Sequence, residues 1–175
     1  MIISSRIHQE RLVYLVIVNY YSHHLIISLL ESLLITNQSP HEIVIINNSN
    51  DDSNLILSKF PYLNINVIKS GKNIGFGCAC NLGLKYIYQQ NKQGLAWLIN
   101  PDTLFISSSV RKVSSFINKH PEISILGCLV YSNDSDIWFG GGFFNDITGN
   151  ILAKDLFFGL YNQTYLNCDW VSGCS

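Results

Sequence analysis

Short runs of apolar residues alternate along this chain with segments whose apolar residues recur at helical spacing. The runs lie at 12–18, 43–47, 65–69, 95–99 and 124–130. The run at 12–18 is continuous, which is typical of a strand that a sheet buries on both faces. Between the first two, Leu25, Leu29 and Leu33 fall on one helical face, with Ser22 placed to cap the helix. Strands separated by helices favour parallel pairing, so the pattern predicts an α/β fold with a mostly parallel sheet flanked by helices.

The pattern changes after residue 131, where glycines at 140–142, 149 and 159 are interleaved with aromatic residues. This mixture predicts short antiparallel pieces and loops instead of another strand and helix. The aromatic residues either pack in a core or hold an acceptor molecule. They are Trp138, Phe139, Phe143, Phe144, Phe157 and Phe158. No internal repeat or linker composition interrupts the chain, so we expect residues 1–175 to form a single domain.

Polar residues follow three of the predicted strands at the point where each strand ends. They are Asn19-Tyr20, Asn47-Asn48 and Asn100-Pro101-Asp102. Because parallel strands present their carboxyl ends at one edge of a sheet, these residues should converge in one crevice, where open α/β sheets bind ligands. Pro101 cannot donate to a sheet ladder and should expose Asp102. A carboxylate there suits a hard divalent cation, although the same residues also follow strands because they form turns.

A glycine-rich segment at 71–81 follows the third predicted strand. Its glycines let backbone amides approach a ligand closely, and the start of the next helix favours anions. A purely structural turn explains the same glycines. A dinucleotide-binding loop is a poorer match, because Gly75-Phe76-Gly77-Cys78-Ala79-Cys80 lacks a third glycine and does not follow the first strand.

Composition narrows the classes of function. Hydrophobic residues make up 47% and charged residues 13% of the 175 positions, which fits a compact domain with a core. A formal net charge of −1, with no basic run among the aromatics, argues against nucleic-acid partners. The 5 cysteines lack zinc-type spacing, and reduced thiols favour a cytoplasmic protein. The apolar run at 12–18 is too short to span a bilayer and does not read as a signal peptide.

Five ordered segments of the chain resemble the family 2 glycosyltransferases, and most closely their bacterial rhamnosyltransferase-like branch. The segments are Val16-Ile17-Val18-Asn19-Tyr20, Ile45-Ile46-Asn47-Asn48-Ser49, Asn73-Ile74-Gly75-Phe76-Gly77, Asn81-Leu82-Gly83-Leu84 and Leu98-Ile99-Asn100-Pro101-Asp102-Thr103. The likeness continues through His120-Pro121-Glu122, residues 138–142 and Asp169-Trp170-Val171-Ser172-Gly173. It implies a GT-A (Rossmann-like) fold that binds a nucleotide-diphosphate-sugar donor together with Mg²⁺ or Mn²⁺.

The resemblance also implies roles for individual residues. The donor-binding residues would be Val18, Asn19, Tyr20, Asn47, Asn48, Asn73, Gly75, Phe76, Asn81, Asn100 and Asp102. Asn19 and Tyr20 would flank the base, and Asp102 would ligate the metal that neutralises charge on the diphosphate leaving group. Asn100 stands where many relatives have the first Asp of an Asp-x-Asp motif. Asn47 departs from an Asp that accepts a hydrogen bond from the base, and its amide keeps an acceptor oxygen without the charge.

A further implication concerns the acceptor side, where Trp170 and Gly173 would lie. Relatives continue into another strand, an acidic motif that supplies the general base, and acceptor-binding helices, and this sequence matches none of these. The resemblance therefore places the general base beyond Ser175, with no catalytic residue in this chain. The aspartates after residue 131 are interpreted as residues that solvate loops. They are Asp134, Asp136, Asp146 and Asp155.

We therefore expect the GT-A sheet to be incomplete at its C-terminal end. The chain would be the donor-binding part of an inverting, metal-dependent glycosyltransferase, binding a donor without transferring its sugar. The implied acceptor is a glycan or lipid-linked molecule of the cell envelope, reached from the cytoplasm with peripheral association at the inner face of the membrane.

Two other functions stay open: a non-catalytic nucleotide-binding or interaction module, and a Rossmann oxidoreductase. Metal-dependent binding of nucleoside diphosphates separates the oxidoreductase from the other two. Sugar transfer separates the enzyme from the module.

Overall fold

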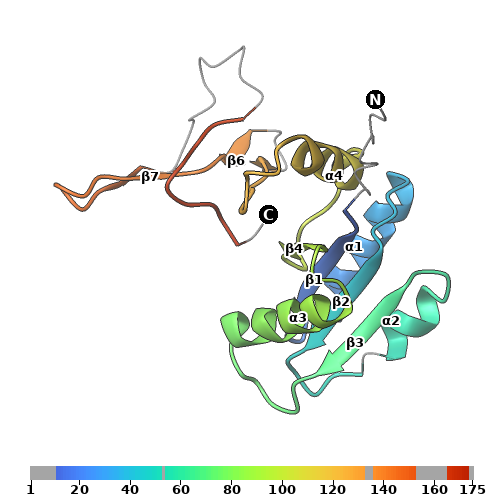
Figure 1. The fold of residues 1–175 in the computed structure, drawn as a ribbon. Coiled ribbons are helices and arrows are strands. Elements are labelled where there is room, and N and C mark those ends of the chain that lie inside the picture. Colours follow the sequence, from blue (N-terminus) through green and yellow to red (C-terminus); the bar gives the residue numbers. More distant parts are fainter. Residues whose placement is uncertain (1–10, 53, 133–135, 153–164, 174–175) are drawn as a thin grey trace, which may run out of the picture. The chain divides into compact units, whose positions relative to one another are not determined.

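The computed structural model describes residues 11–52, 54–132, 136–152 and 165–173 (Figure 1). The chain divides into two compact units, with the boundary between Glu122 and Ile123. Each unit is described by itself below. Whether they form one domain, as the sequence predicts, stays a prediction, since a compact unit need not be an independent domain.

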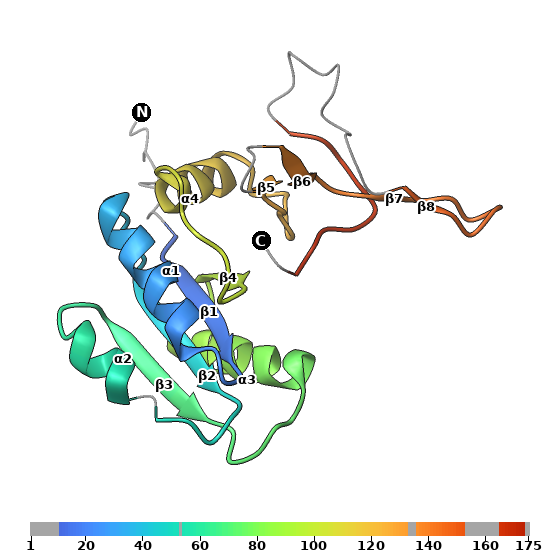
Figure 2. The ribbon, with the colours of Figure 1, turned by 180° about the vertical axis from the view of Figure 1, so that it is seen from behind.

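The first unit is built around four parallel strands in the order β3-β2-β1-β4 (Figure 2). Its elements are β1 (Val13–Asn19), α1 (His23–Ile35), β2 (Glu42–Asn47), α2 (Asn54–Lys59), β3 (Ile65–Lys69), α3 (Phe76–Gln90), β4 (Leu95–Ile99) and α4 (Ser109–Lys119). The predicted parallel α/β sheet is confirmed for its first four strands. Helix α3 begins at Phe76, within the glycine-rich segment, and α4 follows Ser108.

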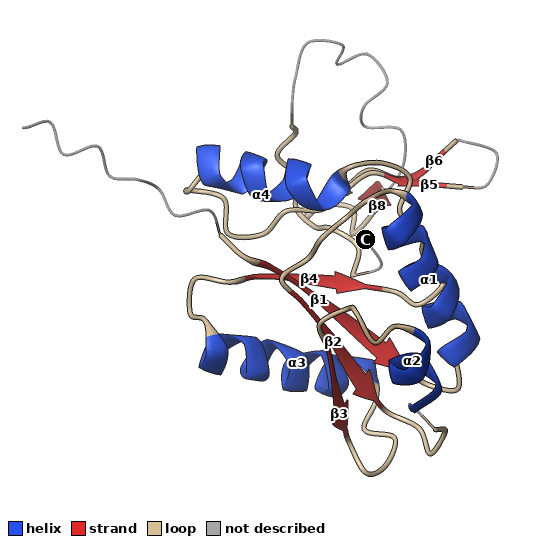
Figure 3. Ribbon diagram, turned by 90° about the vertical axis from the view of Figure 1, so that its right-hand side faces the viewer, coloured by secondary structure: helices blue, strands red, loops and turns tan. Residues whose placement is uncertain are grey.

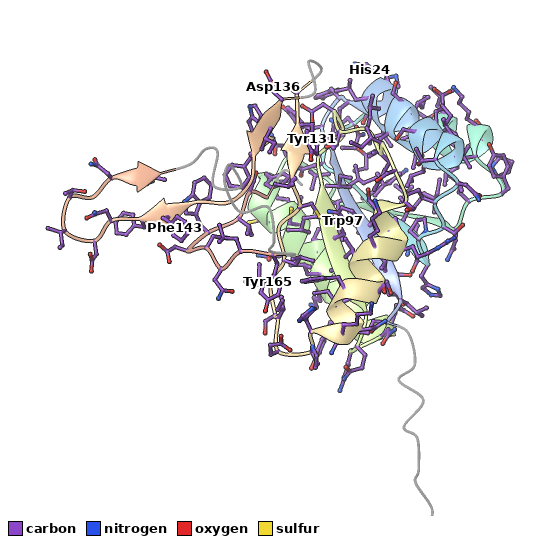
Figure 4. All side chains as sticks on the ribbon, turned by 90° about the horizontal axis from the view of Figure 1, so that it is seen from above. His24, Trp97, Tyr131, Asp136, Phe143 and Tyr165 are labelled. Carbon is purple, nitrogen blue, oxygen red and sulfur yellow. The ribbon has the colours of Figure 1, made fainter. Side chains whose placement is uncertain are left out.

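The two central strands are buried along their whole length. Alternate residues of β1 point to opposite faces: Leu15 and Ile17 pack in the core that includes residues of α1, α2 and α4, whereas Val16 packs in the core under α3. Figure 3 shows α3 on one side of the sheet and α1 on the other. On β4, Trp97, labelled in Figure 4, meets Phe105 edge to face with ring centroids 5.5 Å apart. The two central apolar runs therefore form strands buried on both faces, whereas β3 and β4 are only partly buried.

The strand order reverses beside β1. From β1 the chain moves outward through β2 to β3, then returns to place β4 on the other side of β1. At such a reversal the crossover helices leave toward opposite faces, which opens a crevice at the carboxyl ends of the strands. Asn19 at the end of β1 and Asn100 just after β4 therefore flank the position where a ligand site is expected.

The second unit contains only short antiparallel pairs among its described residues. β5 (Val130–Tyr131) pairs with β6 (Ile137–Phe139), and β7 (Phe143–Phe144) pairs with β8 (Ile151–Leu152). The short antiparallel pieces predicted after residue 131 are confirmed.

The fifth parallel strand predicted at 124–130 is wrong. Only its last residue lies in a strand, and that strand is antiparallel. Ile125 is 77% exposed. The apolar run gives a propensity for burial, but a strand also needs a neighbour of matching register, which a pattern within one segment does not specify. Among the described residues, no helix is long and apolar enough to cross a membrane.

Candidate functional site

The carboxyl ends of β1 and β2 lie at one level of the sheet. Asn19 stands beside Asn47 in the parallel ladder, and Asn47 stands beside Lys69 of β3. Ile17 pairs with Ile99, which puts the turn after β4 at the same edge. The convergence predicted from the sequence is therefore present, and it comes from backbone register alone.

The side chain of Asn19 is enclosed by protein and is only 1% exposed. Its Nδ2 donates to both carboxylate oxygens of Asp51 (2.9 and 3.0 Å) and lies 3.1 Å from Oδ1 of Asn47. Its Oδ1 accepts from the backbone N–H (3.0 Å) and the hydroxyl (3.1 Å) of Ser22. Protein partners therefore use the hydrogen-bonding capacity of this amide, so Asn19 holds its neighbours in place.

Asn47 is enclosed in the same way, at 2% exposure. Its Oδ1 accepts from Asn19 and from the hydroxyl of Ser49 (3.1 Å), and its Nδ2 donates to the backbone carbonyl of Asp51 (3.0 Å). By the resemblance, Oδ1 of Asn47 would accept a hydrogen bond from the nucleotide base, but it already accepts from these protein donors. In this conformation Asn47 shapes the loop after β2. Val18, which is also buried, packs in the core with Val16.

Asp51 is the residue of this edge that the sequence analysis missed. Its carboxylate accepts from Asn19 and from the Ser49 hydroxyl, and Nδ1 of His23 lies 3.5 Å away. Burial acts to raise the pKa of Asp51, but hydrogen bonds from Ser49, Asn19 and His23 outweigh it and hold the pKa below its ordinary value. The site thus contains a fixed negative charge. In the sequence Asp51 is part of a polar run at 47–52, and its position after β2 is the only feature that indicates a role at this edge.

The turn after β1 presents two aromatic rings. Tyr20 and Tyr21 are 52% and 56% exposed, and their ring centroids are 5.0 Å apart. The backbone N–H of Tyr21 donates to the hydroxyl of Ser49 (3.2 Å), and that of Tyr20 donates to the hydroxyl of Ser22 (3.3 Å). Tyr21 has a φ of 53°, which is rare for a residue other than glycine and needs such support. The network below the turn therefore supports the backbone that carries these two exposed rings, whose faces can stack on a planar base.

Asn48 ties the glycine-rich segment to the end of β2. Its Oδ1 accepts from the backbone N–H of Ile74 (2.9 Å) and the hydroxyl of Ser70 (3.2 Å). Its Nδ2 donates to Oδ1 of Asn73 (3.1 Å), which also accepts from the backbone N–H of Gly75 (2.9 Å). Asn48 is 2% exposed and Asn73 is exposed. The predicted residues are brought together, with Asn48 as an anchor behind the loop and Asn73 on its surface.

Gly75 forms the junction between this loop and α3. It caps the helix with a φ of 80°, a left-handed conformation that side chains rarely adopt. Phe76 is 49% exposed, and Asn81 is exposed further along the helix. The exposed start of a long helix attracts anions through its unpaired N–H groups and its dipole. This part of the edge therefore suits phosphate groups.

The turn after β4 places Asp102 in solvent. Thr103 donates to the carbonyl of Asn100 through its backbone N–H (3.2 Å) and its hydroxyl (2.9 Å), closing a turn with Asp102 exposed as predicted. Within the described ranges, no three His, Cys, Asp or Glu residues gather as a metal cage would require. A single carboxylate still fits Mg²⁺ or Mn²⁺, because Mg²⁺ in particular keeps several waters and takes other ligands from substrate phosphates.

The predicted acceptor-side residues lie in the second unit. Trp170 forms a bridge with Gly142, whose backbone N–H donates to the Trp170 carbonyl (3.1 Å), and Gly173 is exposed nearby in sequence. A Cβ on Gly142 would come within 2.1 Å of the indole Nε1, so the ring needs a glycine there. Of the aromatic residues, Phe139 is buried against Trp170, whereas 157–158 lie outside the described residues. The acceptor role of Trp170 and Gly173 stays a prediction.

The position of the general base also stays a prediction. The resemblance places this base beyond Ser175, and Ser175 itself lies outside the described residues, as do Asp134 and Asp155. Asp136 and Asp146 are exposed, which fits residues that solvate loops. No described carboxylate of the second unit is therefore assigned the role of the base.

Comparison with solved structures finds the protein TarS of S. aureus. Its fragment 1–349 matches with a TM-score of 0.53 and 24% identity over 63% of this chain and 33% of the fragment. The same fragment in complex with UDP matches with a TM-score of 0.52 and 23% identity over the same shares. Whole TarS matches equally well, with 20% of its length covered. The chain thus spans about a third of the TarS fragment, and the likeness shows the GT-A fold.

Comparison with curated protein sequences finds no match. The family described as Glycosyl transferase family 2 matches residues 14–171. This range contains the polar strand ends, the glycine-rich segment and the turn with Asp102 described above. Since the match covers nearly the whole chain, the protein belongs to glycosyl transferase family 2.

Proposed function

We propose that the strand ends of the first unit bind the nucleoside diphosphate of a sugar donor, and that the chain is the donor-binding part of an inverting glycosyltransferase. The observation that carries this proposal is the network of Asn19, Asn47 and Asp51, which holds exposed aromatic rings at the reversal of strand order. Membership of the family and the likeness to TarS, which was solved in complex with UDP, support it.

Each part of the donor has a group suited to it. The base stacks on the rings of Tyr20 or Tyr21, and the charge of Asp51 keeps that turn in place. The diphosphate lies toward the loop at 73–77, where Gly75 and the start of α3 offer N–H groups. Asp102 holds the divalent cation, which neutralises charge on the leaving diphosphate when bound.

We place the acceptor among glycans or lipid-linked sugars of the cell envelope, with the protein at the cytoplasmic side and in peripheral contact with the membrane. The exposed rings of Trp138 and Trp170 in the second unit are the surface suited to sugar or lipid contact. Transfer also requires a base that deprotonates the acceptor hydroxyl, and we assign that role to no residue here.

A non-catalytic nucleotide-binding module is the second candidate. One observation favours it, which is that neither carboxylate at the strand ends is free to act as the base. Asp51 accepts hydrogen bonds from Asn19, and Asp102 is assigned to the metal. Both functions predict that this chain alone binds a donor without transferring its sugar, and they differ only when the predicted general base is present. A transfer assay with several nucleotide-sugars and lipid-linked acceptors, run on a protein that includes this base, separates them.

Calorimetric titration with uridine, thymidine and guanosine diphosphates, each with and without Mn²⁺, tests donor binding. We expect at least one to bind in a Mn²⁺-dependent way, and Asp102→Asn to abolish that dependence while the fold stays intact. Asp146→Asn is the matched control, because Asp146 is equally an exposed aspartate but lies in the second unit. Unchanged affinity in Asp102→Asn would mean that Asp102 is a turn residue only.

A further inference from the structure

A cavity of about 390 Å³ opens at the opposite end of β1 from Asn19. Its walls come from the start of β1, from the connection between α1 and β2, and from the first turns of α4. Pockets that take small molecules begin at about 300 Å³. Nothing in the donor-binding proposal uses this cavity.

The walls of the cavity are cationic. Arg11 and Arg111 line it, and no Asp or Glu is among the described residues that do so. The chain as a whole carries a formal net charge of −1, so this concentration of positive groups is local. A concave surface lined by one sign of charge focuses its field and attracts ions of the other sign.

Gln38 contributes a buried hydrogen-bond donor that lacks an acceptor. Its side chain is 6% exposed, and its Oε1 accepts from the backbone N–H of Val110 (2.8 Å). Its Nε2 has no hydrogen-bond partner within the described part of the chain. Buried polar groups are nearly always paired, and an exception needs an explanation. Gln38 is also part of the cavity wall, and an oxygen atom of a bound ligand would supply the missing acceptor once the buried amide turns toward the cavity.

The start of α4 adds a further preference for anions. This helix has 11 residues, and Ser108, its N-cap, makes no side-chain capping bond. Gln38 Oε1 already accepts from the backbone N–H of Val110 in this first turn, so the helix adds only the positive end of its dipole to the cavity wall. The hydroxyl of Ser114 donates to the carbonyl of Arg11 (3.1 Å), which ties α4 to the start of β1 and holds two walls together.

We propose that this cavity binds the phosphate group of a small molecule or a lipid head group, between Arg11 and Arg111 and against Gln38. Arginine pairs with phosphate oxygens through two parallel N–H bonds, a geometry suited to tetrahedral oxyanions. The site is separate from the donor site, since it lies at the amino end of β1 instead of the carboxyl end. Its occupancy therefore does not depend on the function proposed above.

The test is an NMR titration of the full chain with inorganic phosphate and with glycerol phosphate, alongside co-sedimentation with vesicles that contain phosphatidic acid. We expect saturable binding, with shifts of the Gln38 side-chain NH₂ and the Val110 amide for a soluble ligand. Soluble phosphate binding identifies a small-molecule site, and sedimentation without it identifies a head-group site. Either result supports the proposal.

The variant Arg11→Gln/Arg111→Gln should weaken binding about tenfold or more, because two charge-assisted contacts are lost. Its matched control is Lys85→Gln/Lys119→Gln, which removes the same charge from exposed positions outside the cavity. If the first variant does not fold, Arg111→Gln alone carries the test, since Arg111 is exposed. Absence of saturable binding to every probe, or equal weakening by the control, would overturn the proposal.

Discussion

The carboxylate of Asp51 faces the amide of Asn19 across the ends of β2 and β1, with nitrogen–oxygen distances of 2.9 and 3.0 Å. Asn47 lies between them in the sequence and shares the same amide hydrogen-bond donor. The negative charge of this edge thus belongs to the loop after β2, which folds back so that Asp51 contacts the amide of Asn19. Consequences for stability, pH dependence and ligand binding follow from this contact.

Asp51→Asn should lower the free energy of unfolding by about 1–3 kcal/mol at neutral pH, because three donors lose their ionised acceptor. Nucleoside diphosphate affinity should also fall, since the turn with Tyr20 and Tyr21 loses its support. Urea unfolding and calorimetric titration measure the two effects. Asp146→Asn should change neither, and a variant at position 51 as stable as the wild type would show that the network carries no net stability.

The same contact predicts a dependence on pH. The folded pKa of Asp51 lies below its ordinary value of 3.8. The carboxylate therefore contributes stability that is fully present above this value and is lost as the pH falls through the folded pKa. The difference in unfolding free energy between wild type and Asp51→Asn should be constant near about pH 6 and shrink in acid. A difference that grows toward acid would contradict the assigned direction.

Asn48→Ala should release the glycine-rich loop. The variant removes the acceptor of the Ile74 N–H and the donor to Asn73, so amide exchange at 73–75 should accelerate. Affinity for a nucleoside diphosphate should fall more than affinity for the nucleoside alone, because this loop is assigned to the phosphates. Hydrogen exchange and paired titrations measure both. Equal losses for the two ligands would place the diphosphate elsewhere.

Two glycines of α3 should respond in opposite directions to the same change. A Cβ on Gly83 would lie 2.6 Å from Cγ1 of Val16, whereas a Cβ on Gly77 meets nothing within 4 Å. Gly83→Ala should therefore destabilise by about 1–3 kcal/mol through overpacking. Gly77→Ala should stabilise by up to about 1 kcal/mol through helix propensity. Thermal unfolding of both variants checks this, and a neutral Gly83→Ala would mean that α3 is not packed closely on β1.

The first four strands could be predicted from the sequence, because each is mostly apolar and the two central ones, buried along their whole length, are almost entirely so. The same pattern misled at 124–130, where the apolar run lacks a parallel neighbour. Positions at strand ends were predicted well, since register follows from topology. The partners of Asn19 were not, because hydrogen bonds to Asp51 depend on how the loop after β2 folds back. A polar run in sequence does not show which of its members is enclosed.

The most direct test of the account is to locate a bound nucleoside diphosphate by amide exchange in the full chain with Mn²⁺. We predict slower exchange at Tyr20, Tyr21 and residues 73–77, with no change around Gln38 or Val110. In Asp102→Asn the protection at 73–77 should be lost under the same conditions. The contradicting result is saturable binding that slows exchange elsewhere in the chain while exchange at Tyr20, Tyr21 and 73–77 stays unchanged. It would show that the strand ends do not form the donor site.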